Sequence, residues 1–295
     1  MTASYLMPLI MAPILICLIA IAYHIFVPKD FKRDHETNWR RMFSLRTLPY
    51  LVSACFVYLL VKSQLAFVMF LGKVPETSYA SYMIRIEGDA VAYFQSFATP
   101  LLTYSSAFVY LIGFSFLLIF TFLLLMYTQQ HEHLQEYTIA FVSIYLIALP
   151  FYIYVPVPVT GFTLPNVVPL LYNMSPIVLH GVMIVDPFLD NCFPSLHAAL
   201  SVMAMLMVLR TDFKRFKIFA VALTIAIQFT ILYLGIHWIT DMIGGIILAL
   251  GTYFIATRYR KNILKIPERI FVAFEKRTEI FETVNSVLLS KGLIK

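Results

Sequence analysis

The chain is organised around residues 190–209, in which Asp-Asn-Cys-Phe-Pro-Ser-Leu-His is followed by the apolar run Ala-Ala-Leu-Ser-Val-Met-Ala-Met-Leu-Met-Val-Leu. Pro194 has the backbone angle that suits the first position of a helix. The first amide groups of such a helix have no partner within it and form an anion site at the positive end of its dipole. We therefore predict a helix that begins at Pro194 and places His197, one turn in, where it can exchange a proton with a bound anion.

The composition predicts a membrane protein. Of the 295 residues, 60% are hydrophobic and only 13% are charged, and the mean hydropathy is +0.82. Soluble domains carry about 25% charged residues, and about 20 apolar residues cross a bilayer. Seven runs meet or approach that length. They cover residues 6–27, 48–71, 101–127, 137–157, 195–209, 216–234 and 239–257.

These runs predict an all-α fold, a polytopic transmembrane helix bundle with about seven spans. The fifth run is short and needs the apolar loop before it to complete a crossing. A six-span alternative, with the first run lying at the interface, stays open. We expect a first helix and basic loop over residues 1–47, a membrane domain over 48–258 and a basic tail over 259–295. Within that tail, apolar residues near helical spacing predict an amphipathic cytoplasmic helix over residues 265–289.

The basic residues predict the orientation. All but three of the 22 Lys and Arg fall in residues 28–47, residues 210–217 and the tail from residue 258. Seven crossings put these segments on one side, which the positive-inside rule makes cytoplasmic. The net charge of +6 then reflects topology and attraction to anionic lipid, and we expect no nucleic-acid partner. The three cysteines lack the spacing of a disulfide framework or a cysteine zinc site.

A second candidate sequence is Tyr233-Leu-Gly-Ile-His-Trp-Ile-Thr-Asp241. His237 and Asp241 are four residues apart, so on a helix they share a face. The carboxylate can then accept the imidazole N–H and leave the other ring nitrogen free to attack. The fifth and seventh runs point the same way through the membrane. His197, His237 and Asp241 are therefore expected together at the outer face, and Gly235, Gly244 and Gly245 would let the helices approach closely.

Phe193-Pro-Ser-Leu-His-Ala-Ala199 and Gly235-Ile-His-Trp-Ile-Thr-Asp241 resemble two signature motifs of the type 2 phosphatidic acid phosphatase superfamily. The resemblance implies chemistry without a metal or other cofactor. It implies that His237 is the nucleophile that forms a phosphohistidine, that Asp241 orients it and that His197 protonates the leaving oxygen. It also implies that Ser195 and nearby amides hold phosphate oxygens.

The family's basic residues are missing. Its first motif, Lys-x6-Arg-Pro, occurs nowhere, and Thr230-Ile231 stand where the third motif has Ser-Arg. With Tyr154-Val-Pro-Val-Pro158, this pattern resembles the inositol phosphorylceramide synthase-like branch, the inositolphosphotransferases. Developing negative charge still needs stabilisation. Lys62, inside an apolar run, is the candidate cation, and Asn191, beside the motif, is a further candidate for substrate binding.

The sequence therefore predicts transfer of a phosphoryl or phosphoalcohol headgroup on a membrane lipid at the extracytoplasmic or lumenal face, with a lipid or polyol as the acceptor. One alternative is a lipid phosphate phosphatase, in which water resolves the same intermediate. Another is a transporter that uses the histidines as a proton relay, or a family member without activity. The absence of inverted repeats disfavours a transporter.

Overall fold

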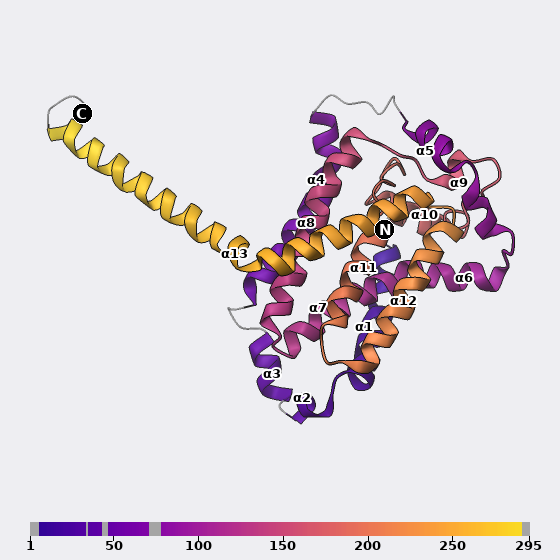
Figure 1. Ribbon diagram of the computed structural model, residues 1–295, viewed down its shortest axis with the longest axis horizontal. Helices are drawn as coiled ribbons and strands as arrows, with labels where there is room; N and C mark the ends of the chain where they lie inside the picture. Colours follow the sequence, from indigo (N-terminus) through magenta and orange to yellow (C-terminus); the bar gives the residue numbers. More distant parts are fainter. Residues whose placement is uncertain (1–5, 34, 43–46, 71–77, 291–295) are drawn as a thin grey trace.

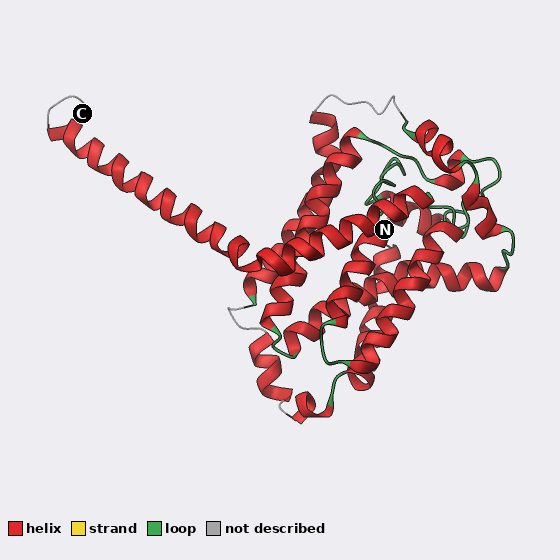
Figure 2. Ribbon diagram, in the orientation of Figure 1, coloured by secondary structure: helices red, strands yellow, loops and turns green. Residues whose placement is uncertain are grey.

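The computed structural model describes residues 6–33, 35–42, 47–70 and 78–290. In these residues the regular structure is helical throughout, apart from one isolated bridge between Val157 and Asn191, which confirms the all-α prediction (Figures 1 and 2). The helices are α1 (Leu6–Phe26), α2 (Lys29–Arg33), α3 (His35–Met42), α4 (Leu48–Phe70), α5 (Ala80–Glu87), η2 (Ala90–Gln95), α6 (Pro100–Phe108), η3 (Val109–Gly113), α7 (Phe114–Tyr127), α8 (His131–Tyr154), α9 (Thr160–Thr163), α10 (Pro176–Met183), α11 (Leu196–Leu209), α12 (Lys214–Tyr233) and α13 (Ile239–Ser290).

Five helical stretches in the described residues are long and apolar enough to cross a membrane. They are Leu6–Phe26, Pro100–Tyr127, His131–Tyr154, Lys214–Tyr233 and Ile239–Lys265. Two shorter apolar stretches, Leu48–Gln64 and Leu196–Leu209, coincide with the second and fifth predicted runs. All seven runs are therefore helical over most of their described length, and five of them are long and apolar enough to cross a bilayer.

Helix α11 lies at the centre of the bundle and packs against α7, α8, α12 and α13. Most of its side chains are buried, and small residues such as Ala198, Ala199 and Ala204 allow close contact with the surrounding helices. By contrast, α1 and α4 expose many large apolar side chains, among them Ile16, Leu59 and Phe70. In a bilayer these side chains face lipid instead of water.

Ion pairs between helices lie at one end of the bundle, and the two predicted motifs lie at the other. Where α8 begins and α11 ends, Glu136 pairs with Arg210, and Glu132 pairs with Arg260 of α13 at 2.6 Å. The starts of α11 and α13 lie at the other end, together with the end of α8. Because α12 runs in the opposite direction between α11 and α13, these two helices start at the same end of the bundle. The two predicted motifs therefore lie at that end, as expected from the number of spans between them.

The C-terminal segment is not a separate helix. Helix α13 continues without interruption to Ser290 and extends away from the bundle (yellow in Figure 1). The expected boundary between the membrane domain and the tail, at residues 258 and 259, lies inside this helix, and residues 252–266 contain neither Gly nor Pro to interrupt it. The division into these two parts stays a prediction. The amphipathic contact of residues 265–289 with a membrane surface stays a prediction.

Candidate active site

The start of α11 differs from the prediction in one detail. Pro194 is not the first helical residue, because Ser195 caps the helix and Leu196 begins it. The Ser195 hydroxyl accepts a hydrogen bond from the amide of Ala198 at 3.3 Å. Ser195 is fully buried and is not part of the cavity lining described below. Its hydroxyl therefore satisfies one of the free amides of the helix start, and its contact with phosphate stays a prediction.

The ring of His197 packs between aromatic side chains. Tyr110 stacks on it with ring centroids 4.2 Å apart, and the Phe114 ring lies at 4.3 Å. Both residues come from the junction of η3, a π-helical turn, with α7. Such turns insert an extra residue into a helix and frequently occur at functional sites. Here the turn lets two aromatic residues of one helix flank the same imidazole.

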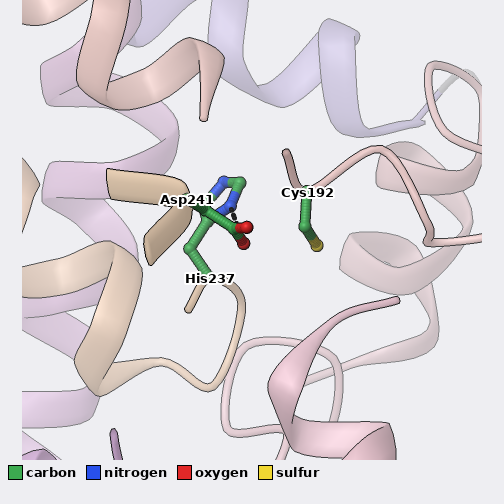
Figure 3. Close-up of side chains that lie close together, drawn as sticks. All are labelled: Cys192, His237 and Asp241. Atoms are coloured by element: carbon green, nitrogen blue, oxygen red, sulfur yellow. Dashed lines mark hydrogen bonds and ion pairs between the residues drawn. The ribbon is translucent and has the colours of Figure 1, made fainter. Parts of the chain in front are cut away.

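His237 lies just before α13 and not on it, because the helix begins at Ile239. The predicted pair nevertheless forms: Nδ1 of His237 lies 3.4 Å from Oδ2 of Asp241 (Figure 3). The same oxygen accepts the amide of Trp238 at 3.0 Å. Asp241 therefore satisfies a free amide at the helix start and holds the ring of His237, so one carboxylate serves both local structure and the site.

A carboxylate from a distant helix caps the start of α13. Glu87, the last residue of α5, accepts the amide of Ile239 at 3.0 Å and the amide of Thr240 at 2.7 Å. It also accepts the Thr240 hydroxyl at 2.7 Å. A negative charge at a helix N-terminus is stabilising. Nothing in the sequence pattern marks Glu87 for this role, because only the tertiary structure brings α5 to this helix.

Direct contacts join the two helix starts. The amide of Ser195 donates to the carbonyl oxygen of Asp241 at 3.1 Å. Gly245 faces the same backbone, and a Cβ there would overlap the Ser195 carbonyl oxygen and come within 2.9 Å of the Ala198 Cβ. The predicted close approach of the helices at Gly245 is confirmed. As a result, the rings of His197 and His237 lie with their centroids 6.1 Å apart.

Both histidines line a cavity of about 320 Å³. Its far wall is apolar and comes from α1, α4 and α10, through residues such as Met11, Leu60 and Val182. The segment between α8 and α11 contributes Tyr172, Asp186 and Asn191, so this long loop forms part of the cavity wall.

Of the other two residues predicted to bind substrate, Asn191 lines the cavity and Lys62 does not. Oδ1 of Asn191 accepts a hydrogen bond from Gln64 at 2.8 Å. Lys62 is exposed on the opposite face of α4, with Nζ 6.0 Å from the centroid of the Tyr58 ring. Helical geometry explains the difference, because Leu60, Val61 and Gln64 share a face that excludes Lys62. Substrate contact by Lys62 stays a prediction.

The described residues that line the cavity include no Lys or Arg. They do include Asp186, whose carboxylate accepts the amides of Asp190 and Asn191. Burial raises the pKa of Asp186, although these amides oppose the shift. Burial and the neighbouring Asp186 also raise the pKa of Asp190 to about 6. The described walls of the cavity therefore carry a carboxyl group and no permanent positive charge.

Two imidazoles and a buried carboxylate therefore lie together at one end of the helix bundle, and the described walls of the cavity beside them carry no Lys or Arg. A model of the PAP2 superfamily matches residues 82–255, more than half of the chain, and the protein belongs to this superfamily. Members of the superfamily are phosphatases or phosphotransferases, which indicates an enzyme that acts on lipid phosphates. Comparison with curated proteins and with solved structures gave no match.

Proposed function

We propose that the protein transfers a phosphoalcohol headgroup between lipids through a phosphohistidine at His237, in the manner of the inositolphosphotransferases. The observation that carries the proposal is a cavity lined by both histidines and by Asp186, with no Lys or Arg among its described lining residues.

Charge favours a phosphodiester donor over a monoester. A phosphodiester carries one negative charge, whereas a phosphomonoester carries about 1.5 to 2 at pH 7. An uncompensated charge in a poorly solvated site is costly. A cavity that holds a carboxyl group and no fixed cation therefore suits the diester. Two polar side chains that can bond the hydroxyl groups of a polyol, Asn191 and Gln64, lie beside it.

The placement of the groups supports the following reaction. Asp241 accepts a hydrogen bond from the Nδ1–H group of His237, which leaves Nε2 free to attack phosphorus. A P–N bond forms, the bond from phosphorus to the diacylglycerol oxygen breaks, and His197 gives that oxygen its proton. An acceptor hydroxyl then attacks phosphorus and returns a proton to His197. The P–N bond breaks, and His237 is regenerated.

The surroundings of the site support a lipid substrate. At about 1.5 Å per residue, the 14 residues of α11 span about 21 Å, less than the roughly 30 Å of a hydrocarbon core. The helix start, and with it the site, then lies below one membrane surface. The apolar wall from α1, α4 and α10 suits lipid chains. The distribution of basic residues assigns this end of the bundle to the extracytoplasmic or lumenal face, which a reporter fused to the C-terminus tests.

The test offers purified protein in detergent either phosphatidylinositol or phosphatidate, with and without ceramide or diacylglycerol analogues as acceptors. Formation of a new inositol phospholipid supports transfer. Release of free inositol phosphate would show that water resolves the intermediate. Phosphate release from phosphatidate alone would contradict the charge argument and assign a lipid phosphatase. Turnover of neither lipid would count against an enzyme.

A further inference from the structure

Cys192 lies beside the catalytic pair. Ligand atoms of Cys192, His237 and Asp241 all lie within 4.8 Å of one another, and all three residues are buried (Figure 3). Cys192 comes from the loop before α11, whereas the other two come from the start of α13. The fold therefore places a thiol, an imidazole and a carboxylate around one point.

One atom of this cluster lacks a partner. Oδ2 of Asp241 has two hydrogen-bond donors, His237 and Trp238. Oδ1 of the same carboxylate is buried and has no hydrogen-bond partner in the described part of the chain. An unpaired buried polar atom is costly, and in native proteins it commonly marks a functional group or a bound ion. This oxygen is available to a cation.

The donor set indicates which cation fits. Sulfur, nitrogen and oxygen donors together suit Zn²⁺ and the softer Cd²⁺, whereas Mg²⁺ requires oxygen donors. Bond lengths of about 2.0–2.3 Å place tetrahedral zinc ligands roughly 3.3–3.8 Å from one another. A pair of ligand atoms at the 4.8 Å limit must therefore approach by roughly 1.0–1.5 Å. The cavity beside them leaves a fourth position for water.

We propose that Cys192, His237 and Asp241 form an inhibitory site for a thiophilic divalent metal such as Zn²⁺. The ion inhibits because it takes a nitrogen of the nucleophile, a step that rests on the proposed function. Bound to Nε2, it blocks the attacking atom. Bound to Nδ1, it leaves the proton of the neutral ring on Nε2, which then cannot attack. The binding itself does not depend on which reaction the enzyme catalyses.

The binding test uses the full chain in detergent, stripped with a chelator, in a Cys17→Ala/Cys55→Ala background. Cys17 and Cys55 are exposed, and their removal leaves Cys192 as the only cysteine. Titration with Cd²⁺ should give the ultraviolet band of a cadmium–thiolate bond, and Cys192→Ala should abolish it. Asp241→Asn, a conservative change, should weaken Cd²⁺ binding at least about tenfold. His180→Ala, at an exposed histidine of α10, should leave the binding unchanged.

The inhibition test measures turnover against Zn²⁺ concentration, relative to the uninhibited rate of each variant. Cys192→Ala should raise the concentration for half inhibition at least about tenfold. No cadmium band in the single-cysteine protein, or equal zinc sensitivity in Cys192→Ala, would overturn the proposal. A cadmium band that depends on Cys192 and Asp241, in a protein inactive on every lipid, would support the metal site and count only against the proposed reaction.

Discussion

The two histidines sit at the starts of parallel helices, but different interactions hold them. His197 follows Ser195, which caps α11 from within its own sequence, and its ring packs against Tyr110 and Phe114. His237 precedes α13, whose start is capped by Asp241 and, from outside, by Glu87.

The contrast suits two chemical roles. A ring held by a carboxylate keeps one tautomer and a free nitrogen, as a nucleophile requires. Aromatic packing holds the ring of His197 in place without a hydrogen-bonded carboxylate among the described contacts, and we propose this ring as the general acid. The following changes test this division of roles.

His237→Ala should have the largest effect. Removal of the nucleophile should lower turnover by about 10⁴-fold or more, for lipid substrates and for activated ones alike. The loss is measured as the turnover of phosphatidylinositol and of a 4-nitrophenyl phosphodiester. His180→Ala is the matched control, because His180 lies on the exposed side of α10. Substantial activity in His237→Ala would assign the nucleophile elsewhere.

His197→Ala should separate the two substrates. Loss of a general acid costs about 10²- to 10⁴-fold when the leaving oxygen needs a proton. A 4-nitrophenyl leaving group departs without one, so the first step with that substrate should be nearly retained. Burst kinetics on both substrates reports this step. Equal losses on the two substrates would contradict the assignment of His197 as the acid.

Gly245→Ala should disturb the distance between the histidines. The new methyl group meets backbone at Ser195, which cannot yield as a flexible side chain can. Displacement of catalytic groups by about 1 Å can cost about 10²-fold in rate. Gly251→Ala, on the same helix with no atom within 4 Å of the added carbon, should be silent. Turnover and thermal unfolding of both variants distinguish lost geometry from lost folding.

Glu87→Ala, which removes the cap at the start of α13 next to His237, should lower turnover less than the changes above. Loss of a helix cap costs about 0.5–2 kcal/mol, and we expect kcat to fall up to about tenfold while KM changes little. Glu87→Gln, which retains one acceptor oxygen, should recover part of the rate. Asp89→Ala removes a nearby exposed carboxylate that bonds only Asn166 among the described contacts, and it serves as the control. A large change in KM instead would indicate that Glu87 contacts substrate.

Lys62→Met should have the smallest effect. Because Lys62 faces away from the cavity, we expect kcat/KM to change by no more than about twofold, as is usual for an exposed charge. Gln64→Leu, two residues along α4, removes the hydrogen bond to Asn191 and should raise KM more. A larger effect at Lys62 than at Gln64 would restore Lys62 as the missing phosphate cation.

The sequence by itself determined the helical class and the apolar runs, and the chemistry that it predicts for three residues stays a prediction. Hydropathy depends on local composition, and the parity of the runs places His197, His237 and Asp241 at one end whatever the packing. The motif spacing also indicated the superfamily. These predictions needed no contact between distant segments.

Only the tertiary structure decided what surrounds these residues. Glu87 caps a helix that is distant in sequence, and Cys192 approaches Asp241 from a different segment. Gln64, and not Lys62, is the polar residue of α4 that lines the cavity. Helical periodicity alone does not fix which face of α4 turns inward, because apolar side chains are spread over every face of that helix. The cysteine spacing could not indicate the proposed metal site, because Cys192 meets His237 and Asp241 of another segment only in the tertiary structure.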